Sequence, residues 1–307
     1  MTNLSLPTPV TGISWLYAHF MDEPGFQKVT EITGMRRIKL FTSVLLSKTI
    51  MNKIPVILSW SGGKDSSYTL HQLLIDGRYE VKYLLSTING VYKRLSMHGV
   101  REELIEAQAK SIGIPLLKVY VYEASNAEYE KQMGDMLLKV KSEGINTVAF
   151  GDIFLEDLRI YREEKMKQAG MDCLFPIWKQ DTKWLVKDFI DKGFKTCICC
   201  INDGYLDESW CGRLIDENFV KELPPAVDPC RENGEFHSFC FEGPIYKSPV
   251  SIIAGEKTYK ALVVNTKEQH TRIKDAGTKG FWFCDLLMQG RHERKNISNY
   301  NGGIRSS

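Results

Sequence analysis

The sequence predicts an α/β protein whose core is a doubly wound, mostly parallel sheet, with a smaller α/β region towards the C-terminus. Two observations lead to this prediction. Short apolar runs alternate with segments of about 10–15 residues in which apolar side chains recur at helical spacing, which is typical of βαβ units. The first apolar run also ends in a Gly-Gly pair, which lets the chain turn sharply from a strand into a helix.

The alternation runs from Pro55 to about Phe175. Each expected strand is a short apolar run, and each expected helix has apolar residues three and four positions apart. Gly144 ends the third helix, because glycine readily takes the left-handed conformation that follows a helix. The expected strands are 56–60, 81–88, 115–121 and 147–151, and the expected helices are 65–74, 101–112, 126–142 and 155–168.

One more round follows, with a helix at 182–192 and a strand at 195–201. After the Pro-Pro pair at 224–225 the pattern changes. We expect residues 238–241 and 259–264 to pair as a hairpin that closes the C-terminal region.

The two ends of the chain lack this pattern. Residues 35–50 are basic and apolar without an acidic residue, and a second methionine, Met51, stands directly before the first expected strand. We expect both ends to be loosely ordered. The expected divisions are an extension at 1–50, a first domain at 51–175, a second domain at 176–267 and a weakly patterned tail at 268–307.

The composition excludes several classes of protein. The 307 residues include 40 Lys and Arg against 38 Asp and Glu, which gives a formal net charge of +2. This balance provides no overall field that would attract a polyanion, so we do not expect nucleic acid as a partner. No apolar stretch approaches the roughly 18 residues that cross a bilayer, so we expect no membrane partner and a cytoplasmic location.

Three of the eight cysteines lie in one apolar run, Lys195-Thr-Cys-Ile-Cys-Cys-Ile201. Alternation of Thr, Cys and Ile favours a buried strand, in which free cysteine behaves as a small hydrophobic residue. A metal site or sulfur transfer is the alternative use of these thiols. We favour burial, with the thiols kept reduced in the cytosol.

The strongest functional signal is Ser61-Gly62-Gly63-Lys64-Asp65-Ser66, which lies between the first strand and the first helix. The two glycines let backbone N–H groups turn towards an anion, and the helix N-terminus adds partial positive charge. Lys64 and the serine hydroxyls add donors. Asp65 would repel phosphate unless Mg²⁺ lies between them, so we expect it to hold the metal. The alternative is a plain turn with a capping side chain.

This loop resembles the PP-loop of the ATP pyrophosphatases, which cleave ATP between its α and β phosphates. Three later segments are similar to the diphthine–ammonia ligase family of that superfamily. They are Ser96-Met-His-Gly-Val-Arg101, Phe150-Gly-Asp-Ile-Phe-Leu-Glu-Asp-Leu-Arg-Ile-Tyr-Arg162 and Asp228-Pro-Cys-Arg-Glu-Asn-Gly-Glu-Phe-His237. The resemblance extends from about Lys53 to Tyr246, and it departs from the family pattern at Arg231, where we expect glycine.

The resemblance implies a Rossmann-like fold of the PP-loop ATPase type, with ATP bound by residues 51–175 and the substrate by residues 176–267. The family converts the carboxylate of diphthine, a modified histidine on elongation factor 2, into an amide with ammonia, while ATP becomes AMP and pyrophosphate. It therefore implies an ATP-dependent carboxylate–ammonia ligase that uses Mg²⁺. Two alternatives stay open, a PP-loop sulfur transferase that modifies tRNA and an ATP-binding protein without turnover.

The residues of the expected nucleotide site follow the first and later strands. We assign the phosphate cradle to Ser61, Gly62, Gly63, Lys64 and Ser66, with Asp65 as the first metal ligand. Gly151 and Asp152 follow the fourth expected strand, at the sheet edge where ligands of such folds bind. Asp152 is the candidate second carboxylate for magnesium or substrate, or else a helix cap. His98 approaches ATP, or else lies exposed in its loop.

A second group, Glu232, Asn233, Glu235 and His237, lies further along the chain. Strand alternation places Glu235 and His237 on one face. Acids that hold ammonium and a base that accepts its proton suit an amidation. With the resemblance, we expect Glu232, Glu235 and His237 to be catalytic together with Asp65.

Overall fold

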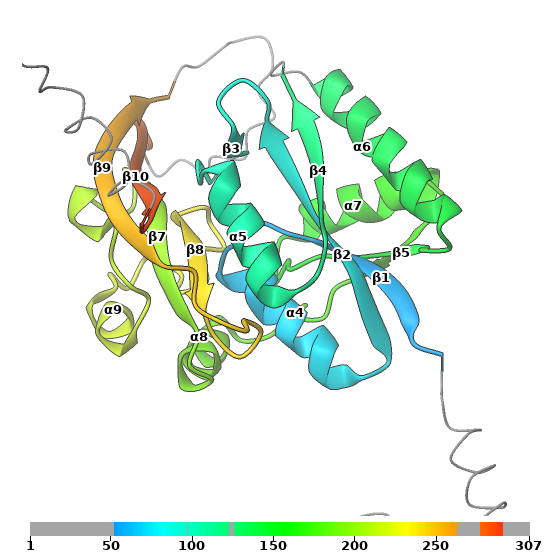
Figure 1. Cartoon of the computed structure of the whole chain (residues 1–307). Coiled ribbons are helices and arrows are strands. Elements are labelled where there is room, and N and C mark those ends of the chain that lie inside the picture. Colours follow the sequence, from blue (N-terminus) through cyan, green and yellow to red (C-terminus); the bar gives the residue numbers. More distant parts are fainter. Residues whose placement is uncertain (1–51, 97, 123–125, 263–276, 291–307) are drawn as a thin grey trace, which may run out of the picture. The chain divides into compact units, whose positions relative to one another are not determined.

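A computed structural model describes residues 52–96, 98–122, 126–262 and 277–290 of the chain. The extension expected at 1–50 lies outside these residues. The described residues form two sheets with helices around them, as Figure 1 shows. No helix among them is long and apolar enough to cross a membrane.

The first sheet contains a short antiparallel strand and five parallel strands. They are β1 (Ile54–Ser59), β2 (Tyr79–Asn89), the antiparallel β3 (Arg94–Leu95), β4 (Leu116–Val121), β5 (Thr147–Ala149) and β6 (Asp172–Leu174). The parallel strands lie side by side in the order β4-β2-β1-β5-β6. The direction of winding reverses between β1 and β5. Ligands of open α/β sheets bind beyond the carboxyl ends of the strands at such a reversal.

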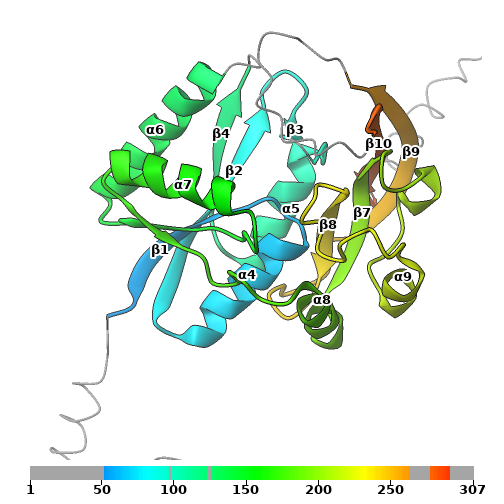
Figure 2. The same ribbon diagram turned by 180° about the vertical axis from the view of Figure 1, so that it is seen from behind.

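Helices cover both faces of this sheet. On one face lie α4 (Lys64–Asp76) and α5 (Glu102–Ile112), and on the other lie α6 (Asn126–Ser142) and α7 (Glu156–Gln168), which Figures 1 and 2 show from opposite sides. Alternate side chains of β1 pack into the two buried clusters on opposite faces of the sheet. Val56 and Leu58 belong to one buried cluster, and Ile57 belongs to the other. The predicted doubly wound α/β class is confirmed.

The second sheet is antiparallel and has the order β8-β7-β10-β9. Its buried side chains belong to the same cluster as those of α4 and α5, so this sheet packs beside the first one. Its elements are α8 (Thr182–Asp191), β7 (Lys195–Asn202), η1 (Glu208–Trp210), α9 (Glu217–Glu222), β8 (Phe236–Glu242), β9 (Ile252–Ala261) and β10 (Gly280–Met288). The division of the chain near residue 175 stays a prediction.

The hairpin expected between residues 238–241 and 259–264 is wrong. β8 pairs with β7, and β9 pairs with β10. The reason is that β10, which comes from the region expected to be a weakly patterned tail, is an inner strand of this sheet. The carboxylate of Asp285 in β10 also accepts hydrogen bonds from Arg94 Nη1 (2.9 Å) of β3 and from Arg101 Nη2 (2.6 Å), which directly precedes α5. The remainder of the expected tail, at 268–276 and 291–307, lies outside the described residues, as do residues 263–267 before it.

The position of β10 gives a test of the fold. Leu286 of β10 is 1% exposed and belongs to the main buried cluster. We expect Leu286→Ala to lower the free energy of unfolding by about 2–5 kcal/mol, because it leaves a cavity in this core. Urea unfolding measures the change. Ile253→Ala on the neighbouring strand is the matched control, since Ile253 is 41% exposed. Equal small losses in both variants would contradict an inner position for β10.

Candidate active site

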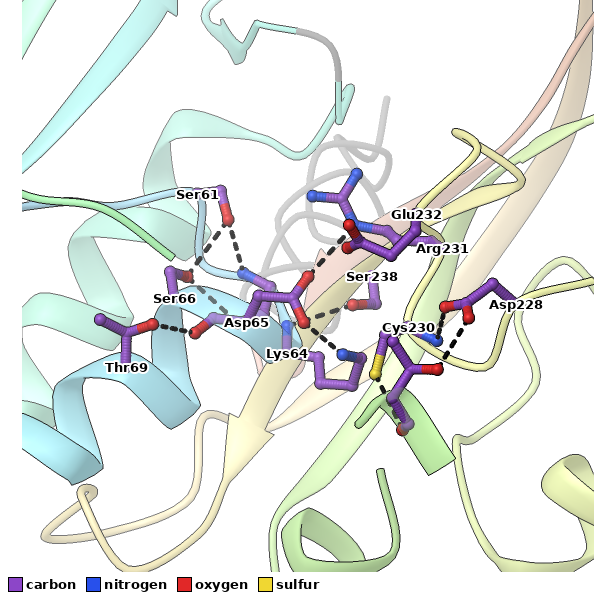
Figure 3. A network of polar contacts seen from close by, with 12 residues as sticks. Ser61, Lys64, Asp65, Ser66, Thr69, Asp228, Cys230, Arg231, Glu232 and Ser238 are labelled. Carbon is purple, nitrogen blue, oxygen red and sulfur yellow. Dashed lines mark hydrogen bonds and ion pairs between the residues drawn. The ribbon is translucent and has the colours of Figure 1, made fainter. Parts of the chain in front are cut away.

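The loop between β1 and α4 has the geometry of an anion cradle. Gly62 has a φ of 68°, which is in the left-handed region that favours glycine. Ser61 Oγ donates to Ser66 Oγ at 3.1 Å, as Figure 3 shows. Ser66 Oγ in turn donates to the Gly63 carbonyl at 3.1 Å. Gly63, the residue before α4, has no side chain that could cap the helix. The capped-turn alternative therefore lacks its local cap, and the N-terminus of α4 keeps N–H groups that can donate to an anion.

Two residues that sequence analysis missed hold this loop in place. Gln108 of α5 is fully buried, and its Nε2 donates to the carbonyls of Gly62 (2.8 Å) and Cys240 (2.5 Å). Ser238 Oγ of β8 accepts from the Lys64 N–H at 3.2 Å. A Cβ at Gly62 would lie 2.4 Å from Gln108 Oε1, and a Cβ at Gly63 would lie 2.8 Å from the Ser238 carbonyl. Both glycines are thus required by the close approach of their neighbours.

Asp65 lies between two cations. Lys64 is 1% exposed and forms a close ion pair with Asp65. Burial lowers the pKa of Lys64, but Asp65 and Cys230 outweigh it, so the pKa is raised and the amine stays charged. On the other side, Arg231 Nε donates to Asp65 Oδ2 at 3.4 Å, as Figure 3 shows. The loop therefore combines a carboxylate with two positive charges in one small volume.

Gly151 and Asp152 lie where the sequence places them, directly after β5. A Cβ at Gly151 would lie 3.0 Å from Thr69 Oγ1 and 3.2 Å from the Asp65 carbonyl, so the chain passes closely over α4. Asp152 Oδ2 is 2.9 Å from Arg162 Nε, although the pair lacks hydrogen-bond geometry. Burial raises the pKa of Asp152, Arg162 and Arg231 oppose this, and Asp65 adds to it. The cap of α7 is Leu155, so Asp152 does not cap that helix.

His98 and His237 lie against each other, with ring centroids 4.4 Å apart. Arg231 Nη1 is 2.7 Å from His237 Nδ1, and since a guanidinium can only donate, Nδ1 accepts. Burial and Arg231 lower the pKa of His98 to about 3, and burial, His98 and Arg231 hold the pKa of His237 well below its ordinary value. Both rings are neutral, so His237 is a weak base that instead orients Arg231. Contact between His98 and ATP stays a prediction.

The structure gives the side chains of Glu235 and His237 different hydrogen-bond partners. Glu235 is fully buried, and its carboxylate accepts from the backbone N–H groups of Asp228 and Asn233 and from Asn233 Nδ2, each at 2.9 Å. The Glu235 carboxylate therefore stabilises the loop before β8 through hydrogen bonds to residues of that same loop. Glu235 directly precedes β8, which begins at Phe236, and the expected position of Glu235 and His237 on one face stays a prediction.

Glu232 lies near the loop between β1 and α4, where the charge of Asp65 acts on it. Its Oε2 accepts from the Phe154 N–H at 2.9 Å, and Figure 3 shows it beside Arg231. Burial, followed by the charge of Asp65, raises the pKa of Glu232 to about 7. A carboxyl group with this pKa exchanges a proton readily at neutral pH.

The described residues contain no group of three or more His, Cys, Asp or Glu side chains that could hold a metal by itself. A magnesium ion that binds with phosphates needs only one or two carboxylates. Asp65 is near enough to Asp152 to raise its pKa. This donor set fits a magnesium ion that arrives with a nucleotide.

The cysteines of β7 are buried, as the sequence predicts. Cys197 and Cys200 have the spacing of a Cys-x-x-Cys pair. However, burial raises the pKa of both thiols to about 12, and the pKa of Cys199 is also raised well above its ordinary value. Sulfur transfer requires a thiolate, so this environment does not favour it.

The fold and this loop define a doubly wound α/β protein with a glycine-rich loop, shaped like an anion cradle, at the reversal of its sheet. Residues 54–173 match the family model described as the diphthamide synthase N-terminal domain, and residues 181–273 match the diphthamide synthase C-terminal domain. The chain belongs to this family, the diphthine–ammonia ligases.

Several curated proteins named diphthine–ammonia ligase match this chain over most of their own length. A human protein named diphthine–ammonia ligase is 22% identical over 220 residues, which cover 64% of this chain and 82% of the human one. Proteins of the same name from rat and from Danio rerio are 23% and 24% identical, over 79% and 64% of this chain and 93% and 85% of their own.

The raised pKa of Glu232 gives a test of the site's electrostatics. The pKa of this acid rises from 4.5 to about 7 on folding, so its stabilising contribution is present below about pH 4.5 and is lost as the pH rises through 7. We expect Glu232→Gln, in metal-free protein, to gain stability relative to the unmodified chain between about pH 5 and pH 8. Urea unfolding across this range measures the difference. A constant difference would contradict the raised pKa.

Proposed function

We propose that the protein is an ATP-dependent, AMP-forming ligase that joins ammonia to the carboxylate of diphthine, the modified histidine on elongation factor 2. Family membership supports the class of reaction, and the printed names of the relatives support the substrate. The observation that carries the proposal is the loop between β1 and α4, where Asp65 lies between two cations. A loop that held phosphate without a metal would have no use for that carboxylate.

The chemistry explains why such an amide synthesis consumes ATP. A carboxylate is a poor electrophile, and ammonia does not displace oxide from it. Attack of the carboxylate on the α-phosphorus of ATP forms an acyl-adenylate and releases pyrophosphate, and ammonia then displaces AMP. Because the carboxylate and the triphosphate are both anions, the protein must neutralise charge where they meet.

The loop residues supply most of this neutralisation. Backbone N–H groups at Gly62 and Gly63 and the N-terminus of α4 would bind the pyrophosphate part of ATP, with Lys64 and the two serine hydroxyls as further donors. Asp65 and Asp152 would hold Mg²⁺, which when bound offsets the charge of the leaving pyrophosphate.

The amidation step needs a group that takes a proton from the attacking nitrogen. Glu232 suits this role, because its pKa is about 7 and the charge of Asp65 acts on it directly. Glu235 would keep the loop that carries Glu232 in shape through its three accepted hydrogen bonds. His237, with its low pKa, would orient Arg231 rather than accept the proton.

The identity of the nucleotide product tests the proposal. The purified protein is incubated with Mg·ATP, ammonium and elongation factor 2 that carries diphthine. AMP, pyrophosphate and an amidated histidine are expected. ADP as the product would overturn the assignment of the loop. ATP binding without any product would favour the alternative of a nucleotide-binding protein without turnover.

The metal assignment has its own test. We expect Asp65→Asn to lower AMP formation by about a hundredfold or more, because the carboxylate that holds Mg²⁺ is lost. Asp172→Asn is the matched control, since Asp172 is an exposed carboxylate at the start of β6, at the opposite edge of the sheet. Initial rates and urea unfolding are measured for both variants. Full turnover in Asp65→Asn would exclude it as the metal ligand.

A further inference from the structure

Arg231 lies at the loop between β1 and α4, with its Nε 3.4 Å from Asp65 Oδ2. We propose that Arg231 is an additional phosphate-binding residue, whose guanidinium moves from Asp65 to the phosphates when Mg·ATP binds. The inference rests on the proposed binding of ATP at this loop, but it does not depend on the carboxylate substrate.

The backbone shows why glycine suits this position and how arginine is held there. Arg231 has a φ of 67°, in the left-handed region that side chains with a Cβ adopt at a cost in free energy. The turn is fixed on both sides: the Arg231 N–H donates to the Asp228 carbonyl at 3.0 Å, and the Gly234 N–H donates to the Arg231 carbonyl at 2.9 Å. Such strain persists where the surroundings determine the conformation, commonly at functional sites.

The side chain of Arg231 has a fixed orientation, but some of its N–H donors are left without a close partner in the described contacts. His237 Nδ1 accepts from Nη1 at 2.7 Å, which fixes the direction of the guanidinium plane. The contact of Nε with Asp65 is 3.4 Å, longer than the 2.7–2.9 Å that is usual for charge-assisted hydrogen bonds. A guanidinium carries five N–H donors, and the side chain of Arg231 is 25% exposed. It therefore has donors left for a second anion.

The charges at the loop explain why the guanidinium would exchange partners. Asp65 is already in a close ion pair with Lys64, so in the free protein it offsets two cations at once. A magnesium ion on Asp65 would face the positive charges of Lys64 and Arg231. Phosphate oxygens relieve this repulsion, since they accept from both cations, and arginine binds them in a bidentate way. Arg231 thus favours binding of metal and nucleotide together.

The opposite role is also physically possible, and it predicts the opposite result. If Arg231 only shielded Asp65 from magnesium, its removal would tighten the binding of Mg·ATP. The sign of the change in affinity therefore separates the two roles, and binding can be measured without any turnover.

The experiment measures the affinity of the full chain for Mg·ATP and for Mg·pyrophosphate by titration calorimetry. Arg231→Ala and Arg231→Gly are expected to bind both about ten- to a hundredfold more weakly, and Arg231→Lys to lose less, because it keeps the charge without the planar donor group. Arg78→Ala is the control, since Arg78 is an exposed arginine paired with Asp76 at the far end of α4. Unchanged or tighter binding in the Ala and Gly variants overturns the inference.

Further measurements show whether weaker nucleotide binding comes from loss of fold, and whether the ligase function and the role of Arg231 fail independently. Arg231→Gly should unfold at the same or a higher urea concentration, because glycine relieves the left-handed strain, so weaker binding would not reflect loss of fold. If nucleotide affinity stays unchanged while the affinity for the carboxylate substrate falls, Arg231 binds that substrate instead and the inference fails. If the unmodified chain binds Mg·ATP but forms no AMP, the proposed ligase function fails and the role of Arg231 stands.

Discussion

The close contact between β8 and the loop after β1 is the constraint on which the site depends. The Cys240 N–H donates to the Gly62 carbonyl at 2.8 Å, and Gln108 joins the same carbonyl to that of Cys240. These bonds are buried, so breaking one would leave an unsatisfied polar group in the core. The second sheet therefore sets the shape of a loop that belongs to the first, and the proposed anion site would require both sheets.

This constraint also explains how much of the site the sequence could predict. The strands and helices around the first sheet have clear periodicity, and the loop from Ser61 to Ser66 is a local pattern, so both were predictable. Gln108 and Ser238 were not, because their roles depend on contacts between residues 46 and 174 positions apart in the chain. β10 was missed for a related reason, since its place as an inner strand depends on long-range pairing.

Glu235 and His237 show a different limit of short-range rules. Alternation along a strand places them on one face, but Glu235 precedes the strand and turns into its own loop, where it accepts three hydrogen bonds. A catalytic role for these residues stays a prediction, and their hydrogen-bond partners could not be predicted from the sequence. A buried carboxylate needs several donors, and only the folded loop shows that the backbone supplies them.

The site is held together by a balance of charge that no single residue provides. Arg231 donates to His237, and the charge of Arg231 helps to lower the pKa of this histidine. Asp65 pairs with two cations, and its charge raises the pKa of Glu232. A change in any one of these groups alters the others through short distances in a buried environment. A bound Mg·ATP would add both the positive charge of the metal and the negative charges of the phosphates to this site. The proposed reaction therefore starts from a site whose ionised groups neutralise one another until the substrate replaces their partners.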